Sequence, residues 1–246
     1  MFSGKTNNVR NGPKAETPIE GWPERPRTGE PPPNRYHREM TSYENSWNRL
    51  WRSLGAGVVD QQLLPELVRR YSEPQRKYHT LQHLDACLRH FASLRDQATR
   101  PDEVELALWF HDAVYEVGQP GNEAKSADWA RGAVVAAGGS PAVAERIHAL
   151  VMVTCHDVAP STPDQEVLLD ADLSILGAPP ATFDAYEVQI RAEYATVEED
   201  AFRSRRRRIL QQFLGRPRIY HTDQFHGKFE TQARDNLARS IRQLDR

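Results

Sequence analysis

The chain has 246 residues, of which 39% are hydrophobic and 27% are charged, and its formal net charge is −2. This composition is typical of a soluble protein, and the charge gives no global attraction to nucleic acid or to an anionic membrane. No apolar run reaches the roughly 18 residues that a membrane span requires. The two cysteines, Cys87 and Cys155, form no disulfide framework and no signal peptide is expected, so we expect a reduced, cytoplasmic protein.

The first 40 residues differ in composition from the rest of the chain. Seven prolines fall between positions 13 and 33, among glycine, asparagine, glutamate and arginine. Such a segment offers little apolar surface to offset the entropy of ordering the chain, so residues 1–40 are predicted to be a disordered, proline-rich arm. The arm is interpreted either as a tail that binds a partner or as a dispensable extension.

From residue 41 onward, apolar residues recur at helical spacing and are interrupted by glycine and proline. The pattern predicts ten helices, at residues 41–54, 60–71, 79–97, 101–115, 123–137, 141–155, 164–176, 180–200, 202–214 and 228–244. No run alternates β-branched with polar residues as a strand would. We therefore expect an all-α protein in which residues 41–246 form a single compact helical-bundle domain.

His111 and Asp112 follow directly on an apolar run at residues 106–110. Burying a carboxylate without a partner costs several kcal/mol or more, so a buried Asp is normally paired or bound to a metal. On an ideal helix the two side chains diverge by about 100°, yet both can reach one ion that lies near a helix end. The alternative interpretation is a salt bridge at the end of the helix.

Two further segments carry candidate metal ligands. His79 and His83 are four residues apart, so both imidazoles would lie on one face of a helix, although such a pair is more often an accident of sequence than a site. Asp170 and Asp172 lie in another apolar stretch and would point about 200° apart on a helix. Only one of these two carboxylates can therefore face a shared ion, and the spacing alone leaves open which one.

The order His, His-Asp, Asp on an all-α background resembles the HD-domain superfamily of metal-dependent phosphohydrolases. Residues 78 to about 237 are most similar to a group of predicted bacterial HD phosphohydrolases of undefined substrate. The matching motifs are YHTLQH at 78–83, LWFHDAVY at 108–115, NE at 122–123, LDADL at 169–173 and IY at 219–220. The first and fourth of these also resemble segments of the class I cyclic-nucleotide phosphodiesterases.

The resemblance implies that His83, His111, Asp112 and Asp172 bind a divalent ion, which selects Asp172 over Asp170. Two imidazoles and two carboxylates suit Mn, Fe, Co, Ni or Zn, and suit Mg less well. We expect one ion, or two if Asp112 bridges them as in the phosphodiesterases. A bound ion would acidify water and so supply hydroxide as the nucleophile. The implied activity is hydrolysis of a phosphate ester or anhydride in a small, nucleotide-like molecule.

Six other residues are candidates for supporting roles. The first His of the phosphodiesterase motif is a general acid, so the resemblance implies that His79 protonates the leaving oxygen. The alternative is that His79 makes a hydrogen bond that supports a metal ligand. In some HD nucleotidases a Glu shortly after the His-Asp pair orients the attacking water, which makes Glu116 and Glu123 candidates at a somewhat different spacing. Candidate substrate-binding residues are Arg76, Lys125, Glu123 and His156. For each of these the alternative is a solvated charge or a histidine at the edge of the core.

Two other classes of function are alternatives. The first is an HD scaffold that binds a nucleotide as a sensor without hydrolysing it. The second is an RNA-binding helical protein that uses the arginines at 203 and 205–208. The acids at 198–200 and the net charge of −2 instead favour a solvated helix face, so nucleic acid is not an expected partner. The sequence predicts no oligomeric state.

Overall fold

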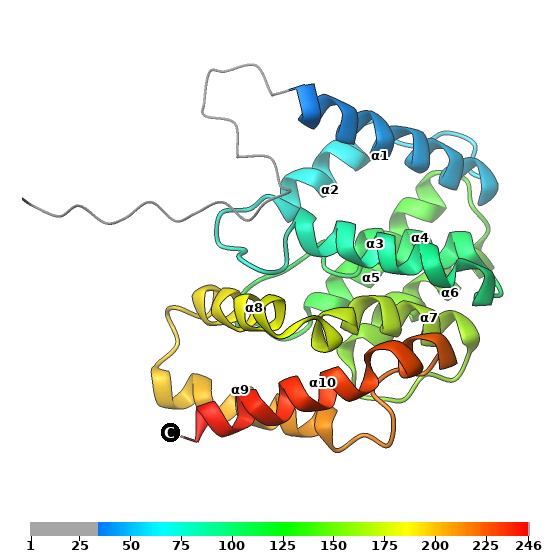
Figure 1. The fold of residues 1–246 in the computed structure, drawn as a ribbon. Helices are drawn as coiled ribbons and strands as arrows, with labels where there is room; N and C mark the ends of the chain where they lie inside the picture. The colour runs from blue at the N-terminus through cyan, green and yellow to red at the C-terminus, as the bar shows by residue number, and fades with distance from the viewer. Residues whose placement is uncertain (1–33, 246) are drawn as a thin grey trace, which may run out of the picture. The chain divides into compact units, whose positions relative to one another are not determined.

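The structure is a computed structural model that describes residues 34–245, with side chains described from Tyr43 onward (Figure 1). These residues form ten α-helices and three short 3-10 helices and contain no strand. The α-helices are α1 (Asn34–Ser53), α2 (Leu63–Tyr71), α3 (Leu81–Leu94), α4 (Pro101–Phe110), α5 (Asn122–Ala136), α6 (Pro141–Met152), α7 (Pro163–Asp172), α8 (Pro180–Glu193), α9 (Glu199–Leu214) and α10 (Asp223–Leu244). The 3-10 helices are η1 (Arg95–Gln97), η2 (Val153–Cys155) and η3 (Leu173–Gly177). The all-α prediction is confirmed.

The chain divides into two compact units, residues 1–46 and residues 47–246. Helix α1 begins at Asn34, so residues 34–40, which the composition assigned to the proline-rich arm, are helical. The remainder of the predicted arm, residues 1–33, lies outside the described residues. All of the candidate site residues lie in the second unit.

Several helices begin where the sequence placed capping residues. Thr80, Ser140, Thr162 and Thr222 each accept a hydrogen bond from a backbone N–H of the first turn that follows, at α3, α6, α7 and α10 respectively. These caps satisfy backbone donors that have no partner within the helix. Proline also occupies the first turn of α4, α6, α7 and α8, where its missing N–H costs nothing.

Helix α4 lies at the centre of the second unit and packs against α3, α5, α6 and α7. Its apolar residues from Val104 to Phe110 are 0–1% exposed, which explains why the run at 106–110 is continuous rather than amphipathic. Its two interior acids are buried but paired, since Glu103 accepts hydrogen bonds from Arg146 and Glu105 accepts them from Arg49 and Arg95. This largely buried helix ends at Phe110, directly before the His-Asp pair.

Helix ends differ from the prediction at three places that affect the candidate site. Helix α3 starts at Leu81, so His79 precedes the helix that carries His83. Helix α4 stops at Phe110 rather than near residue 115, and helix α8 stops at Glu193 rather than at residue 200. Within the described part of the chain, no helix is long and apolar enough to span a membrane.

Candidate metal centre

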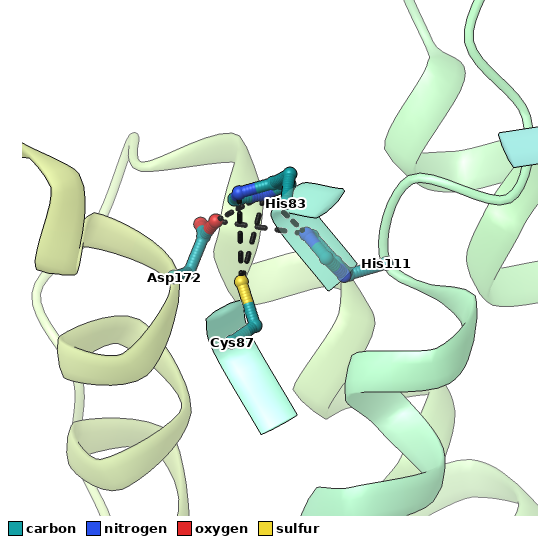
Figure 2. A group of neighbouring side chains, drawn as sticks. All are labelled: His83, Cys87, His111 and Asp172. Atoms are coloured by element: carbon teal, nitrogen blue, oxygen red, sulfur yellow. Dashed lines mark hydrogen bonds and ion pairs between the residues drawn. The ribbon is translucent and has the colours of Figure 1, made fainter. Parts of the chain in front are cut away.

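Three elements bring four predicted ligands to one place. His83 lies in the first turn of α3, Asp172 is the last residue of α7, and His111 and Asp112 directly follow α4. Figure 2 shows His83, His111 and Asp172 converging from these separate elements. Asp112 lies beyond the end of α4, so the 100° angle between neighbouring positions of an ideal helix does not constrain the direction of its side chain.

The donor atoms of these four residues are spaced as ligands of one ion would be. His83 Nε2 lies 3.1 Å from His111 Nε2, 3.5 Å from Asp112 Oδ2 and 3.3 Å from Asp172 Oδ1. His111 Nε2 lies 3.1 Å from Asp112 Oδ2 and 3.6 Å from Asp172 Oδ1. Ligands at about 2.0–2.2 Å from a shared tetrahedral or octahedral ion are roughly 2.8–3.6 Å apart. The five separations that involve His83 or His111 are therefore those expected around one divalent ion.

A hydrogen bond fixes the orientation of the His111 ring. Its Nδ1 lies 2.7 Å from the carbonyl oxygen of Leu108, an arrangement in which Nδ1–H donates to that carbonyl. In the neutral imidazole, Nε2 then carries the lone pair and faces the other donors. Partners of this kind hold metal-binding histidines in the binding tautomer.

The electrostatics of the cluster favour charged carboxylates. Burial opposes ionisation of Asp112 and Asp172, but the neighbouring histidines hold the pKa of each carboxyl well below its ordinary value. Burial likewise lowers the pKa of His111, but Asp112 and Asp172 raise it well above its ordinary value. Two carboxylates that are only 17% and 11% exposed, beside two imidazoles, make a strong electrostatic site for a cation.

Cys87 is a further donor in the cluster and was not among the ligands predicted from the sequence. One donor atom each from His83, Cys87, His111 and Asp172 lie within 4.8 Å of one another, so these four residues could hold a metal ion. The sulfur lies 3.6 Å from both ring nitrogens of His83. A sulfur atom at this distance from both nitrogens lies over the face of the imidazole ring. It is therefore away from the direction in which the lone pair of Nε2 points. His83 and Cys87 are four residues apart in α3 and so lie on one face of the helix, and this spacing is the sequence signal that could have indicated Cys87 as a donor.

His79 is oriented by a buried carboxylate that no motif indicated. Glu193, at the end of α8, places Oε2 2.7 Å from His79 Nδ1, and its Oε1 accepts hydrogen bonds from the backbone N–H groups of Lys77, Tyr78 and His79. The ring of Tyr115 stacks on His79 at 4.1 Å. The Nδ1 atom of His79 is thus committed to Glu193, which leaves Nε2 available.

His156 contacts the candidate ligand Asp172. Its Nε2 lies 3.3 Å from Asp172 Oδ2, the carboxylate oxygen that is not shared with His83 and His111. The backbone of His156 has φ 59°, a left-handed conformation that is uncommon for residues other than glycine. Arg216 donates to its carbonyl oxygen at 2.8 Å, and Phe213 contacts its ring. This geometry supports a role in orienting the carboxylate of Asp172.

Asp170 and Asp172 have different roles. The buried carboxylate of Asp170 accepts hydrogen bonds from the N–H of His221 at 2.7 Å and from the N–H and hydroxyl of Thr222 at 2.8 and 2.6 Å. Asp170 therefore anchors the start of α10, and only Asp172 lies with the histidines.

The buried guanidinium of Arg76 does not fit the phosphate contact that the sequence suggested. It donates to the carbonyl oxygens of Asp112 at 2.6 Å, Ala113 at 3.0 Å and His79 at 3.2 Å, and to the carboxylate of Glu73 at 3.3 Å. Because its donors are used in this way, Arg76 ties the segment that carries His79 to the segment that carries Asp112.

The remaining candidates are divided between two surfaces. Glu116 and Lys125 are exposed and pair with each other at 3.1 Å, and neither lines the cavity that contains the metal ligands. Glu123, at the start of α5, does line that cavity. The distance in sequence from the His-Asp pair could not predict which glutamate lines the cavity, because that depends on the loop at 116–121, which turns Glu116 toward solvent.

A cavity of about 550 Å³ adjoins the candidate ligands. Its lining includes His79, His156 and Glu123, and a largely apolar wall from α8 and α9. That wall consists of Tyr186, Ile190, Phe202, Ile209 and Phe213, together with Arg205 and Arg206. A volume of this size is typical of sites for organic ligands, which span roughly 300–1,000 Å³.

No protein-family model matches the sequence, and comparisons with curated proteins and with solved structures found no significant match.

Proposed function

We propose that this protein is a metal-dependent phosphohydrolase of the HD type, with His83, His111, Asp112 and Asp172 as the ligands of one divalent ion. The observation that carries the proposal is the set of five donor separations between 3.1 and 3.6 Å. Mixed imidazole and carboxylate donors suit Mn, Fe, Co, Ni or Zn. An ion bound there would acidify a water molecule and neutralise charge on a phosphoryl group.

The residues of the cavity support a hydrolytic reaction. In such a reaction water attacks phosphorus, the bond from phosphorus to the ester oxygen breaks, and that oxygen takes up a proton. His79 is the candidate proton donor, because Glu193 occupies its Nδ1 and its ring lines the cavity. Tyr115 and Glu193 restrict the His79 ring to one orientation.

The size and lining of the cavity support an organic substrate. A cavity of about 550 Å³ far exceeds the needs of inorganic phosphate. The aromatic residues in its wall, including Tyr186 and Phe213, offer surfaces for a flat or apolar group. We therefore propose a small phosphorylated molecule with a nucleotide-like body as the substrate.

Metal analysis and a phosphate-release screen of the purified protein test this proposal together. We expect the wild-type protein to retain a divalent transition metal and to release phosphate from at least one nucleotide or aryl phosphate. His111→Ala and Asp112→Ala should lose both properties. Matched controls are His148→Ala and Asp128→Ala, since these residues pair with each other at 3.4 Å outside the cavity. Activity that survives both site substitutions would refute the proposal, whereas metal binding without turnover would support a nucleotide sensor.

A further inference from the structure

The arginine run of α9 consists of residues with different environments. Three of its members are engaged within the protein. Arg203 and Arg207 donate to the carbonyl oxygen of Leu244, at the end of α10. Arg206 is buried, with its guanidinium hydrogen-bonded to Glu187 and lying 5.0 Å from the centre of the Tyr186 ring. These three arginines stabilise the packing of α8, α9 and α10.

The other two members, Arg205 and Arg208, are exposed. Neither makes a hydrogen bond or ion pair with any residue in the described part of the chain. They differ in position, because Arg205 lines the cavity beside the candidate metal ligands and Arg208 does not. Arg205 is thus a cation in the cavity wall whose charge the described residues leave unneutralised.

Arg205 lies far from the metal end of the cavity. Phe213 marks that end of α9, since its ring is 5.4 Å from the ring of His156, which contacts Asp172. Arg205 precedes Phe213 by two helical turns, which corresponds to about 12 Å along the axis. Ile209 lies between them on the same face and is 42% exposed. This face of α9 therefore runs from an aromatic ring through an aliphatic side chain to a free cation.

We infer that Arg205 binds a second anionic group of the substrate, remote from the phosphate that is hydrolysed. The inference rests on the proposed function and names the substrate class as an organic phosphate with two separated anionic groups. Ile209 and Phe213 contact the body that joins these groups, and a nucleoside bisphosphate is the model compound. A guanidinium suits this role because it forms paired hydrogen bonds with phosphate or carboxylate oxygens.

The test compares a nucleoside bisphosphate with phenyl phosphate, which lacks a second anion, as substrates of the metal-loaded protein. Arg205→Ala should raise KM for the bisphosphate by roughly 10–100-fold, the loss expected for one charge-assisted contact. It should leave kcat for the bisphosphate and both constants for phenyl phosphate unchanged. Arg205→Lys should restore part of the affinity. Arg208→Ala is the matched control and should change neither KM.

An equal change in KM for both substrates, or no change for either, would overturn the role of Arg205. Calorimetry with the nucleoside bisphosphate on wild-type and Arg205→Ala protein provides the second arm of the test. If the wild-type protein releases phosphate from neither compound and from no other compound of the nucleotide and aryl phosphate screen, the proposed function fails. The inference about Arg205 is then still decided, because it requires the bisphosphate to bind the wild-type protein and to bind Arg205→Ala at least about tenfold more weakly.

Discussion

Replacing Glu193 with glutamine should weaken both the fold and the orientation of His79. The carboxylate side chain is fully buried and accepts three backbone hydrogen bonds at 2.7–3.0 Å, besides its contact with His79 Nδ1 at 2.7 Å. Glutamine can keep one acceptor oxygen for the backbone groups, but its amide nitrogen then faces His79. Nδ1 must become an acceptor, which moves the proton of the neutral ring to Nε2 and changes the group presented to the cavity.

The expected loss of stability follows from the pKa of Glu193. Burial alone would raise this pKa, but the hydrogen bonds from His79 and the backbone lower it from the ordinary 4.5 to about 2. At 1.36 kcal/mol for each pH unit, this difference corresponds to roughly 3 kcal/mol. Because the pKa is depressed in the folded protein, the stabilisation is present above pH 4.5 and is lost as the pH falls toward 2. Glu193→Gln should therefore be less stable by about 3 kcal/mol at neutral pH.

Urea denaturation at several pH values measures this effect. The stability difference between wild type and Glu193→Gln should shrink as the pH falls from about 4.5 toward 2, because protonated glutamate resembles glutamine. Glu199→Gln is the control, since Glu199 is 58% exposed and its pairing with Arg191 should contribute less than about 1 kcal/mol. A difference below about 1 kcal/mol at neutral pH, or one that does not depend on pH in this range, would show that the Glu193 carboxylate does not stabilise the fold in this way.

Three further substitutions separate the site from its supports. His156→Ala should weaken metal binding by roughly 10–100-fold, measured by competition with a chromophoric chelator. His156→Gln should recover part of the affinity, because its amide can donate to Asp172. Equal affinities in all three proteins would exclude a positioning role for His156. Asp170→Ala removes the acceptor of the N–H groups of His221 and Thr222 at the start of α10. It should lower the free energy of unfolding in urea by roughly 2–5 kcal/mol and leave the metal stoichiometry unchanged. Loss of metal from a folded Asp170→Ala protein would contradict the structural role of Asp170. Trp109→Ala, at a side chain that is 1% exposed, should cost about 3–5 kcal/mol in the same assay, and a cost below about 1 kcal/mol would show that α4 is not a rigid support.

The helices could be predicted from sequence because their signals are local. Proline in the first turn and threonine at the cap, as at Thr162 and Pro163, require only a few neighbouring residues. The candidate ligands could be named because each lies beside a recognisable motif. Their convergence depends on how α3, α4 and α7 pack, which no local pattern encodes.

Other features of the site depended on long-range contacts and could not be predicted. Glu193 is 114 residues from His79 in the sequence, and nothing near it indicates a site. An arginine such as Arg76 is a typical phosphate-binding residue, but its guanidinium donates to three backbone carbonyl oxygens instead. The arginine run shows the same limit, since charge patterning could not distinguish Arg205 from its paired neighbours.

X-ray absorption spectroscopy of the zinc-loaded protein would show directly whether the two histidines and two carboxylates bind one ion. We predict one bound ion whose nearest shell holds only nitrogen and oxygen at about 2.0–2.2 Å, with outer scattering from two imidazoles. Asp112→Ala, prepared in the same way, should retain no zinc bound through histidine. A sulfur neighbour at about 2.3 Å would place Cys87 in the shell instead, and a protein that binds no zinc through histidine would contradict the proposed metal centre.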